Sequence, residues 1–105
     1  LHADVEWHDQ RELPGATVHR GIEAVEQHLA ASGEALDYYA TDLLETVDAG
    51  ACVVAAYRFH ARGQSSGVPV ERDAVYVYRF RGAKIDRVEI FGTRDAALEA
   101  AGLSE

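Results

Sequence analysis

Residues 69–91 read PVERDAVYVYRFRGAKIDRVEIF. The segment 69–81 is rich in valine, tyrosine and phenylalanine, and the segment 84–93 alternates between apolar and polar residues, as strands do. The residues GAK at 82–84 form a tight connection between them. The sequence therefore predicts two neighbouring antiparallel strands.

Working outward from this hairpin, two more strands and a closing helix are predicted. Residues 51–62 (ACVVAAYRFHAR) indicate a strand, and GQSSG at 63–67 indicates the hairpin loop that follows it. The run DVEWH at 4–8 indicates a short strand. A short helix is expected after Thr93, whose side chain can cap it.

A helix is predicted over residues 22–32. Ile22, Val25 and Leu29 fall at helical spacing, and Gly33 is a plausible C-cap. The run ALDYYATDLLETV that follows is ambiguous, because its centre favours a strand while Leu-Leu-Glu also suits a helix. The order of elements predicts an α+β domain with a helix packed on one face of a curved sheet.

The bulk composition limits the function classes. The 105 residues suit a single domain spanning 1–105, and the net charge of −8 argues against binding to nucleic acid or to an anionic membrane. No run is long and apolar enough to span a membrane. Cys52 is the single cysteine and lies in an apolar run, so we expect a buried, inert thiol and a reducing cytoplasm.

Four stretches resemble a known family. They are HADVEWHD at 2–9, HRGIEAVEQHLA at 19–30, DAVYVYRFRGAKIDRVEIF at 73–91 and RDAALEAAGL at 94–103. In this order they resemble the SnoaL-like branch of the NTF2-like superfamily, which is related to polyketide cyclases and ketosteroid isomerases. The resemblance implies an NTF2-like cone, a strongly curved antiparallel sheet wrapped around helices. The family usually carries a "dGKI" turn, from which Gly82-Ala83-Lys84-Ile85 departs by one residue.

The resemblance also implies that a further element, besides the predicted helix at 22–32, covers the sheet. Either a helix that precedes the first strand in the family is missing here, or a second subunit covers the other face. Family members often form homodimers through the outer face of the sheet. We expect this contact to use the outward-facing residues Val54, Arg58, Val75, Val77, Arg79 and Glu89.

On the inner face the family carries a pocket for a small apolar molecule. Strand alternation and the resemblance assign its wall to Tyr57, Phe59, Tyr76, Val88 and Ile90. Trp7 is expected to form a further wall beside the first strand.

Asp9 is the candidate general base. In ketosteroid isomerases an aspartate at the end of the first strand has this role, and Asp9 falls on that position. We expect burial against Trp7 to raise the pKa of its carboxyl group toward useful base strength. The alternative is that Asp9 merely begins the next loop, where aspartate is common.

Tyr76 and His28 complete the candidate catalytic set. The resemblance places Tyr76 where isomerases carry an acid that hydrogen-bonds the oxyanion, and Tyr57 could do the same from the adjacent strand. His28 borders the apolar face of the helix and is a possible second proton carrier, or a simple boundary residue. His8 is expected to be exposed and His19 to lie in a loop.

The residues predict a reaction without metal or cofactor. Neither His-x-x-x-His nor Cys-x-x-Cys spacing occurs, and there is no glycine-rich phosphate loop. The leading hypothesis is an isomerase or cyclase that abstracts a proton next to a carbonyl in a steroid- or polyketide-like substrate. The alternative is a non-enzymatic ligand-binding or dimerisation module of the same fold. A third, an epoxide hydrolase, needs an inward Asp-Arg-Asp set, whereas Asp73 and Arg79 are expected to face outward.

Overall fold

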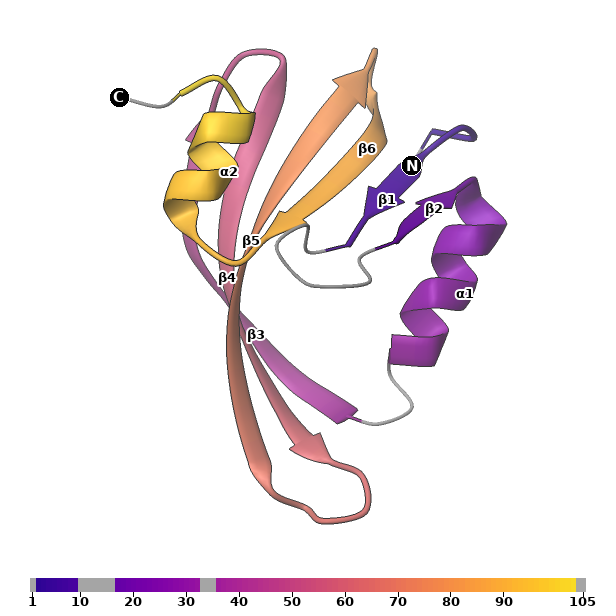
Figure 1. Cartoon of the computed structure of the whole chain (residues 1–105), viewed down its shortest axis with the longest axis vertical. Coiled ribbons are helices and arrows are strands. Elements are labelled where there is room, and N and C mark those ends of the chain that lie inside the picture. Colours follow the sequence, from indigo (N-terminus) through magenta and orange to yellow (C-terminus); the bar gives the residue numbers. More distant parts are fainter. Residues whose placement is uncertain (1, 10–16, 33–35, 104–105) are drawn as a thin grey trace.

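The computed structural model describes residues 2–9, 17–32 and 36–103, and in them a six-stranded sheet with two helices. The elements follow in the order β1 (Glu6–His8), β2 (Val18–Arg20), α1 (Ile22–Ser32), β3 (Leu36–Asp48), β4 (Cys52–Gly63), β5 (Pro69–Arg81), β6 (Lys84–Phe91) and α2 (Arg94–Ala100). Figure 1 shows α1 and α2 at opposite sides of the sheet. None of the helices in this part of the chain is long and apolar enough to cross a membrane.

The strand order is β2-β1-β6-β5-β4-β3. Strands β3 to β6 form the predicted antiparallel meander, and β1 pairs antiparallel with β2. The sheet is mixed, because β1 pairs in parallel with β6. These two strands are joined through the rest of the chain, so no short hairpin turn forces them to be antiparallel.

Most predicted elements are confirmed. The helix at 22–32 and the strand at 69–81 have the predicted bounds, and the ambiguous run forms β3. Thr93 caps α2, since its hydroxyl accepts a hydrogen bond from the backbone N–H of Ala96 at 3.2 Å. The three-residue strand β2 was not predicted, because a segment that short carries almost no alternation to detect.

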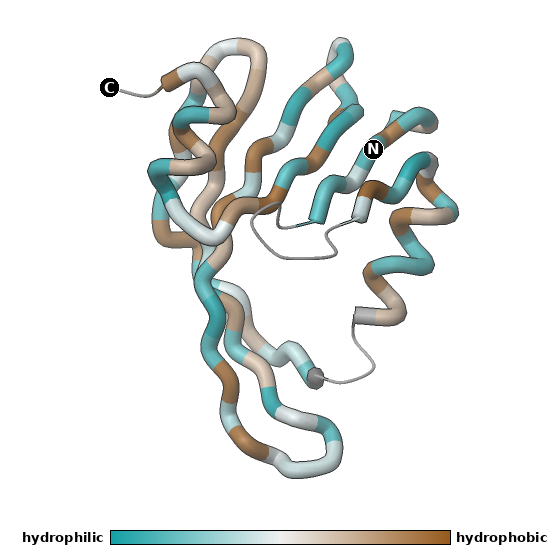
Figure 2. The backbone as a smooth tube through the Cα atoms, viewed as in Figure 1, coloured by the Kyte–Doolittle hydropathy of each residue, from teal (hydrophilic) through white to brown (hydrophobic). Residues whose placement is uncertain are grey.

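The alternation of strands β4 to β6 sorts apolar residues onto two faces of the sheet, and Figure 2 shows this alternation along β5 and β6. The face toward α1 carries one buried cluster, made of Val5, Trp7, Val25, Ala74, Val88 and Ile90. Phe59, Tyr76, Tyr78 and Ile85 pack against it and stay partly exposed. The predicted common face of Tyr57, Phe59, Tyr76, Val88 and Ile90 is confirmed.

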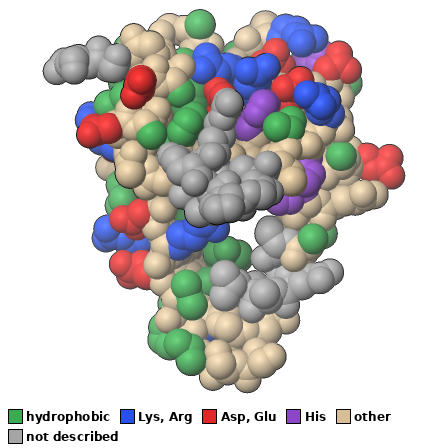
Figure 3. Space-filling model, viewed as in Figure 1, with side chains coloured by type: hydrophobic (Ala, Val, Ile, Leu, Met, Phe, Trp, Pro, Cys, Tyr) green, Lys and Arg blue, Asp and Glu red, His purple; other side chains and the backbone are tan. Residues whose placement is uncertain are grey.

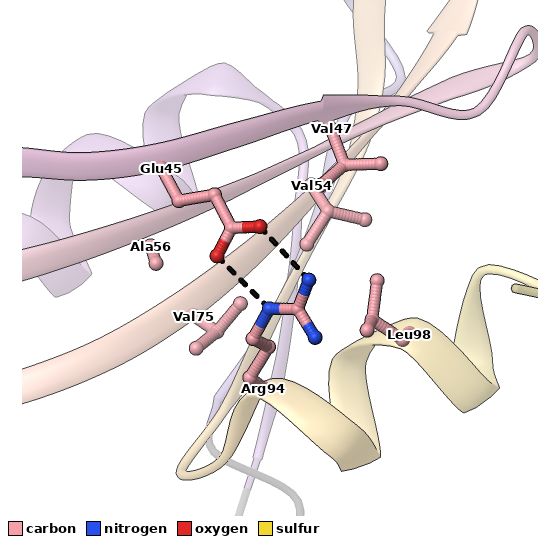
Figure 4. Close-up of a pocket in the computed structure, with 7 residues that line it drawn as sticks. All are labelled: Glu45, Val47, Val54, Ala56, Val75, Arg94 and Leu98. Carbon is pink, nitrogen blue, oxygen red and sulfur yellow. Dashed lines mark hydrogen bonds and ion pairs between the residues drawn. The ribbon is translucent and has the colours of Figure 1, made fainter. Parts of the chain in front are cut away.

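The opposite face is covered by α2. Its buried cluster consists of Cys52, Val54, Val75, Val77, Phe91 and Ala97, which confirms the buried thiol. Arg94 of α2 reaches across this face to Glu45 of β3 in a bidentate ion pair of 2.9 Å (Figure 4). The hollow beneath the pair has no room for a water molecule.

This cover corrects the expected dimer contact. Val54, Val75 and Val77 do face outward, but they are 3%, 6% and 0% exposed because α2 of the same chain lies on them. The closing helix is only seven residues long. Its small side chains nevertheless allow it to lie close to the sheet, so these valines are unavailable to a second subunit.

Strands β4 and β5 extend well past the helices, and the lower parts of β3, β4 and β5 curve toward the side on which α1 lies (Figure 1). Strand β3 has irregular pairing between Tyr38 and Ala40 and between Leu43 and Glu45. Such bulges bend a strand and increase its twist. The bend gives the sheet a concave side that faces α1.

We predict that Val77→Ala lowers the free energy of unfolding by about 2 kcal/mol, since it removes two methyl groups from a fully buried site and leaves a cavity. Val68→Ala is the matched control, because Val68 is 56% exposed, and it should change stability by less than about 0.5 kcal/mol. Urea unfolding of both variants measures the difference. Equal effects would show that α2 does not cover this face in solution.

Candidate functional site

Asp9 lies where the chain leaves β1, and the backbone fixes its position. Its N–H donates a hydrogen bond to the carbonyl of Thr17 at 3.0 Å, which extends the pairing of β1 with β2. The Thr17 hydroxyl donates to Asp9 Oδ2 at 2.8 Å. On the other side, His28 Nε2 of α1 lies 2.8 Å from Asp9 Oδ1. Both carboxylate oxygens are therefore held by defined partners.

His19 joins this group from β2. Its Nε2 is 2.9 Å from the Thr17 hydroxyl and 3.7 Å from Asp9 Oδ2. Its ring stacks on that of His28, with centroids 3.9 Å apart. The prediction of a loop position for His19 is wrong, because it pairs with Trp7 in the β1–β2 ladder. His19 is a member of the site that the sequence interpretation missed.

The environment of Asp9 shifts its pKa opposite to the expected direction. Partial burial raises the pKa of Asp9, but the Thr17 hydroxyl and the imidazoles of His28 and His19 together lower it more. The net pKa lies below the ordinary value of an aspartate. The expected rise is thus wrong, because the carboxylate faces hydrogen-bond donors rather than a dry apolar wall.

Aromatic rings continue from this polar group along the concave side. Trp7 contacts His28 at a centroid distance of 6.4 Å and meets Tyr76 edge-on at 5.9 Å. Tyr76 in turn meets Tyr57 at 5.2 Å and Phe59 at 6.0 Å. In the space-filling view, histidine and hydrophobic side chains both appear on the face shown (Figure 3). An apolar wall with polar groups at one end is typical of small-molecule sites.

Two phenols of this wall, those of Tyr76 and Tyr78, have raised pKa values. Burial raises the pKa of Tyr76 to about 12, with small contributions from neighbouring groups that include Asp9. Burial and a hydrogen bond to Tyr57 also raise the pKa of Tyr78, whose hydroxyl lies 2.9 Å from that of Tyr57. A neutral phenol can donate a hydrogen bond to a carbonyl or an enolate oxygen. Tyr78 shares its strand face with Tyr76, so alternation alone could have added it to the predicted wall.

The other residues named from the sequence differ in how far they are buried. Val88 and Ile90 are 1% and 7% exposed, so they support the wall from within the core. Trp7 is 9% exposed, and its indole Nε1 has no hydrogen-bond partner among the described residues. His8 is half-buried rather than exposed, because its ring is 3.0 Å from the carboxylate of Glu6.

Asp73 and Arg79, the acid and base considered for an epoxide hydrolase, face outward, as predicted. Asp73 receives two hydrogen bonds from Arg58, at 2.8 and 3.1 Å. Arg79 donates to Glu89 and to the backbone carbonyl of Ala100 on the α2 side. Neither Asp73 nor Arg79 can therefore supply the inward set that an epoxide hydrolase needs.

Three side chains of the site also have the donor types of a metal centre. Asp9, His19 and His28 each offer one ligand atom, and these atoms lie within 4.8 Å of one another. Their positions in the sequence follow no metal-binding spacing, because each comes from a different element. Spacing motifs could not have found this group.

Residues 1–88 match the family model of the SnoaL-like domain. The chain belongs to the SnoaL-like domain family. The match covers the whole β1–β2–α1 unit that carries Asp9, His19 and His28, and most of the meander. No curated protein is similar enough to the chain to count as a match.

Solved structures agree with the NTF2-like cone of this SnoaL-like chain. An NTF2-like protein from Burkholderia xenovorans is 25% identical, with 95% of this chain and 76% of that one covered and a TM-score of 0.70. A protein with a ketosteroid isomerase-like fold from Catenulispora acidiphila, solved with trimethylamine, is 15% identical, with 98% and 77% covered and a TM-score of 0.75.

A third structure, from Mesorhizobium loti, was provisionally assigned as a SnoaL-like polyketide cyclase. It is 21% identical, with 86% of this chain and 76% of that one covered and a TM-score of 0.72. At these identities the last two likenesses establish the fold alone.

We predict that Tyr76 ionises at about pH 12 in the folded protein. Folding raises the pKa of Tyr76 above its ordinary value of 10, so the protonated phenol stabilises the folded state. This contribution to stability is complete below pH 10 and is lost as the pH rises through 12. The measurement is tyrosinate absorbance after rapid pH jumps, taken before unfolding. The wild-type titration minus that of Tyr76→Phe should show one group near pH 12; a difference centred at pH 10 would contradict the burial.

Proposed function

We propose that this SnoaL-like protein binds a small, largely apolar carbonyl compound on its concave side and moves a proton next to the carbonyl. The observation that carries the proposal is the convergence of Asp9 and His28, from two separate elements, at 2.8 Å beside the aromatic wall. The apolar rings would bind a steroid- or polyketide-like carbon skeleton. The polar groups are concentrated at one end, where they would meet its reactive carbon.

In this proposal His28 and Asp9 act as a pair. His28 Nε2 lies 2.8 Å from Asp9 Oδ1, so we propose the tautomer that carries its proton on Nε2, facing the carboxylate, which leaves Nδ1 as the basic nitrogen. None of the described residues hydrogen-bonds to Nδ1. Asp9, with its lowered pKa, is a poor proton acceptor but stabilises the imidazolium that forms. His28 therefore takes the proton from the carbon next to the carbonyl, and Asp9 orients the ring.

Tyr76 would stabilise the enolate. With a pKa of about 12 it is neutral at physiological pH, so it can donate a hydrogen bond to the oxygen on which negative charge develops. The Tyr57 hydroxyl is already paired with Tyr78, so Tyr76 is the better donor. Return of the proton from His28 to another carbon would complete an isomerisation. Attack of the enolate carbon on a second carbonyl, followed by transfer of the proton from His28 to the new alkoxide oxygen, would complete an aldol-type cyclisation.

We predict that the protein catalyses exchange of the hydrogens next to the carbonyl of polycyclic ketones into D₂O. His28→Gln should lower the exchange rate by about 100-fold because the general base is lost, and Asp9→Asn should lower it by about 100-fold because the imidazolium loses the carboxylate that stabilises and orients it. Tyr76→Phe should lower it by about 100-fold, because one hydrogen-bond donor to the oxyanion is lost. Proton NMR of each ketone over time measures these rates.

Asp73→Asn and Tyr39→Phe are matched controls. Asp73 lies on the outer face, Tyr39 is 54% exposed, and neither substitution should change the rate by more than about twofold. Equal rates in Asp9→Asn and Asp73→Asn would refute the role of Asp9. A ketone that quenches the fluorescence of Trp7, the single tryptophan, without any exchange would favour the alternative, a ligand-binding module.

We also infer a homodimer, formed through β3. This strand ends the described sheet, and a long unpaired edge is usually covered in native proteins. Its exposed large apolar side chains include Tyr39, Leu43 and Leu44, which are 54%, 59% and 50% exposed. A cytoplasmic location remains a prediction, supported by the buried, unpaired Cys52.

Leu44→Asp should convert the dimer into a monomer, because a charge in the contact would lose its hydration. Val68→Asp places the same charge at a similarly exposed valine in the β4–β5 connection and should leave the dimer intact. Light scattering coupled to size-exclusion chromatography measures the mass. A stable dimer should form at protein concentrations up to about 100 μM. A wild-type chain that is still monomeric at about 100 μM would refute the inference.

A further inference from the structure

We propose that Asp9, His19 and His28 form a binding site for one divalent transition-metal ion of the Zn²⁺ or Co²⁺ type. This goes beyond the proposed function, which uses no metal. The three ligand atoms lie within 4.8 Å of one another and come from the end of β1, from β2 and from α1. The site therefore exists only in the folded chain.

The donor set suits these ions. Two imidazole nitrogens and one carboxylate oxygen are common ligands of Zn²⁺ and its neighbours, with water in the remaining position. Ligands around a tetrahedral ion with bonds of about 2.1 Å are about 3.4 Å apart. His28 Nε2 lies 2.8 Å from Asp9 Oδ1, His19 Nε2 lies 3.7 Å from Asp9 Oδ2, and one ligand atom from each of the three residues fits within 4.8 Å. Small side-chain rotations would thus bring all three to an ion.

The backbone holds the ligands in place before an ion arrives. Trp7 pairs with His19 across the β1–β2 ladder, and the N–H of Gly21 donates to the carbonyl of Val5 at 2.7 Å, which ties the start of α1 to β1. The chain at Gly21 has a φ of 85°, a conformation that glycine adopts without strain. This sharp turn directs α1 back over β1, so His28 reaches Asp9.

The ligands are also accessible. The side chains of Asp9, His19 and His28 are 26%, 26% and 24% exposed, so an ion and its water can enter. The same atoms already contact one another within the chain: the Thr17 hydroxyl hydrogen-bonds with Asp9 and His19, and His28 Nε2 lies 2.8 Å from Asp9 Oδ1. An ion would replace the Nε2 protons of both imidazoles, since only the deprotonated nitrogen binds a metal.

The surface offers a natural comparison. His60 also contacts two carboxylates, Asp42 at 2.8 Å and Glu71 at 3.6 Å. This group has one imidazole instead of two, and both of its acids are 60% exposed. It matches the proposed site in having a histidine between acids but lacks the second nitrogen ligand, so we do not expect it to bind a transition metal tightly.

The test is a titration of the whole chain, free of any affinity tag and stripped with a chelator, with CoCl₂ and with ZnCl₂. Visible absorbance reports Co²⁺ coordinated by the protein, and calorimetry gives the Zn²⁺ affinity. We expect one ion per chain, with a dissociation constant on the order of 10 μM. Zn²⁺ at 1 mM, roughly 100 times that value, should also raise the unfolding temperature.

Loss of any ligand should weaken binding by more than about 10-fold, as tested with His19→Ala, His28→Gln and Asp9→Asn. His60→Ala is the control and should bind as the wild type does. Far-ultraviolet circular dichroism checks that each variant folds, and the conservative His28→Gln keeps the test valid if His19→Ala does not.

Three outcomes would overturn the proposal. They are no Co²⁺ absorbance or Zn²⁺ heat from the wild type, wild-type affinity in folded His19→Ala and His28→Gln, and an equal loss in His60→Ala. None of these measurements uses a substrate, so the metal site and the proton-transfer reaction can fail separately. If both hold, Zn²⁺ should inhibit the exchange reaction, because an ion on His28 makes its ring far less basic.

Discussion

The pairing of β1 between β2 and β6 is the constraint on which the site depends. Only three residues long, β1 forms ladders on both of its edges, which fixes Trp7 opposite His19 on one side and Val88 on the other. The alternation of a strand then places the indole in the core and ends the strand at Asp9. Charges reinforce the pairing, since Glu6 contacts Arg20 on β2 and Arg87 on β6.

The two faces of the sheet divide structural and functional roles. The face under α2 is filled, with a buried Glu89 paired to Arg79 and the Glu45–Arg94 pair sealing the edge. The face toward α1 is buried near β1 and β6 and becomes partly exposed along the tyrosines of β4 and β5. A chain of 105 residues has a limited core, so it can leave an aromatic surface open on one side only if the other side is packed.

Much of the fold could be predicted from local patterns. Alternation in the residues of β4, β5 and β6 and helical spacing in α1 are long signals, and they fixed which side chains share a face. The parallel partner of β1 and the strand β2 could not be found this way, because pairing between distant segments leaves no local trace. The cover of Val54 and Val77 by α2 was missed for the same reason, since the direction of a terminal helix depends on tertiary contacts.

Several residues that the structure groups around Asp9 were named from the sequence, but the electrostatics of this group were not foreseen. Asp9, His28, Trp7 and Tyr76 were named from strand ends, helix faces and the family resemblance. The sign of the Asp9 pKa shift depends on Thr17 and His19, which are eight and ten residues away in the sequence and meet the carboxylate only through the β1–β2 pairing. Such a shift is a sum of opposing contributions from burial and from donors, so the identity of one neighbour decides its direction.

The same carboxylate explains why two stacked imidazoles are tolerated. Two positive charges on rings stacked 3.9 Å apart would repel each other, but both rings place Nε2 near the negative charge of Asp9, His28 at 2.8 Å and His19 at 3.7 Å. The arrangement therefore favours one cation in the group at a time, either a proton taken up by a ring or an ion that replaces the Nε2 protons. The indole N–H of Trp7 is a donor only and has no partner among the described residues, so Trp7 does not compete with Asp9 for the protons of the imidazoles. The chemistry of this end of the sheet then depends on which cation the Asp9 carboxylate holds.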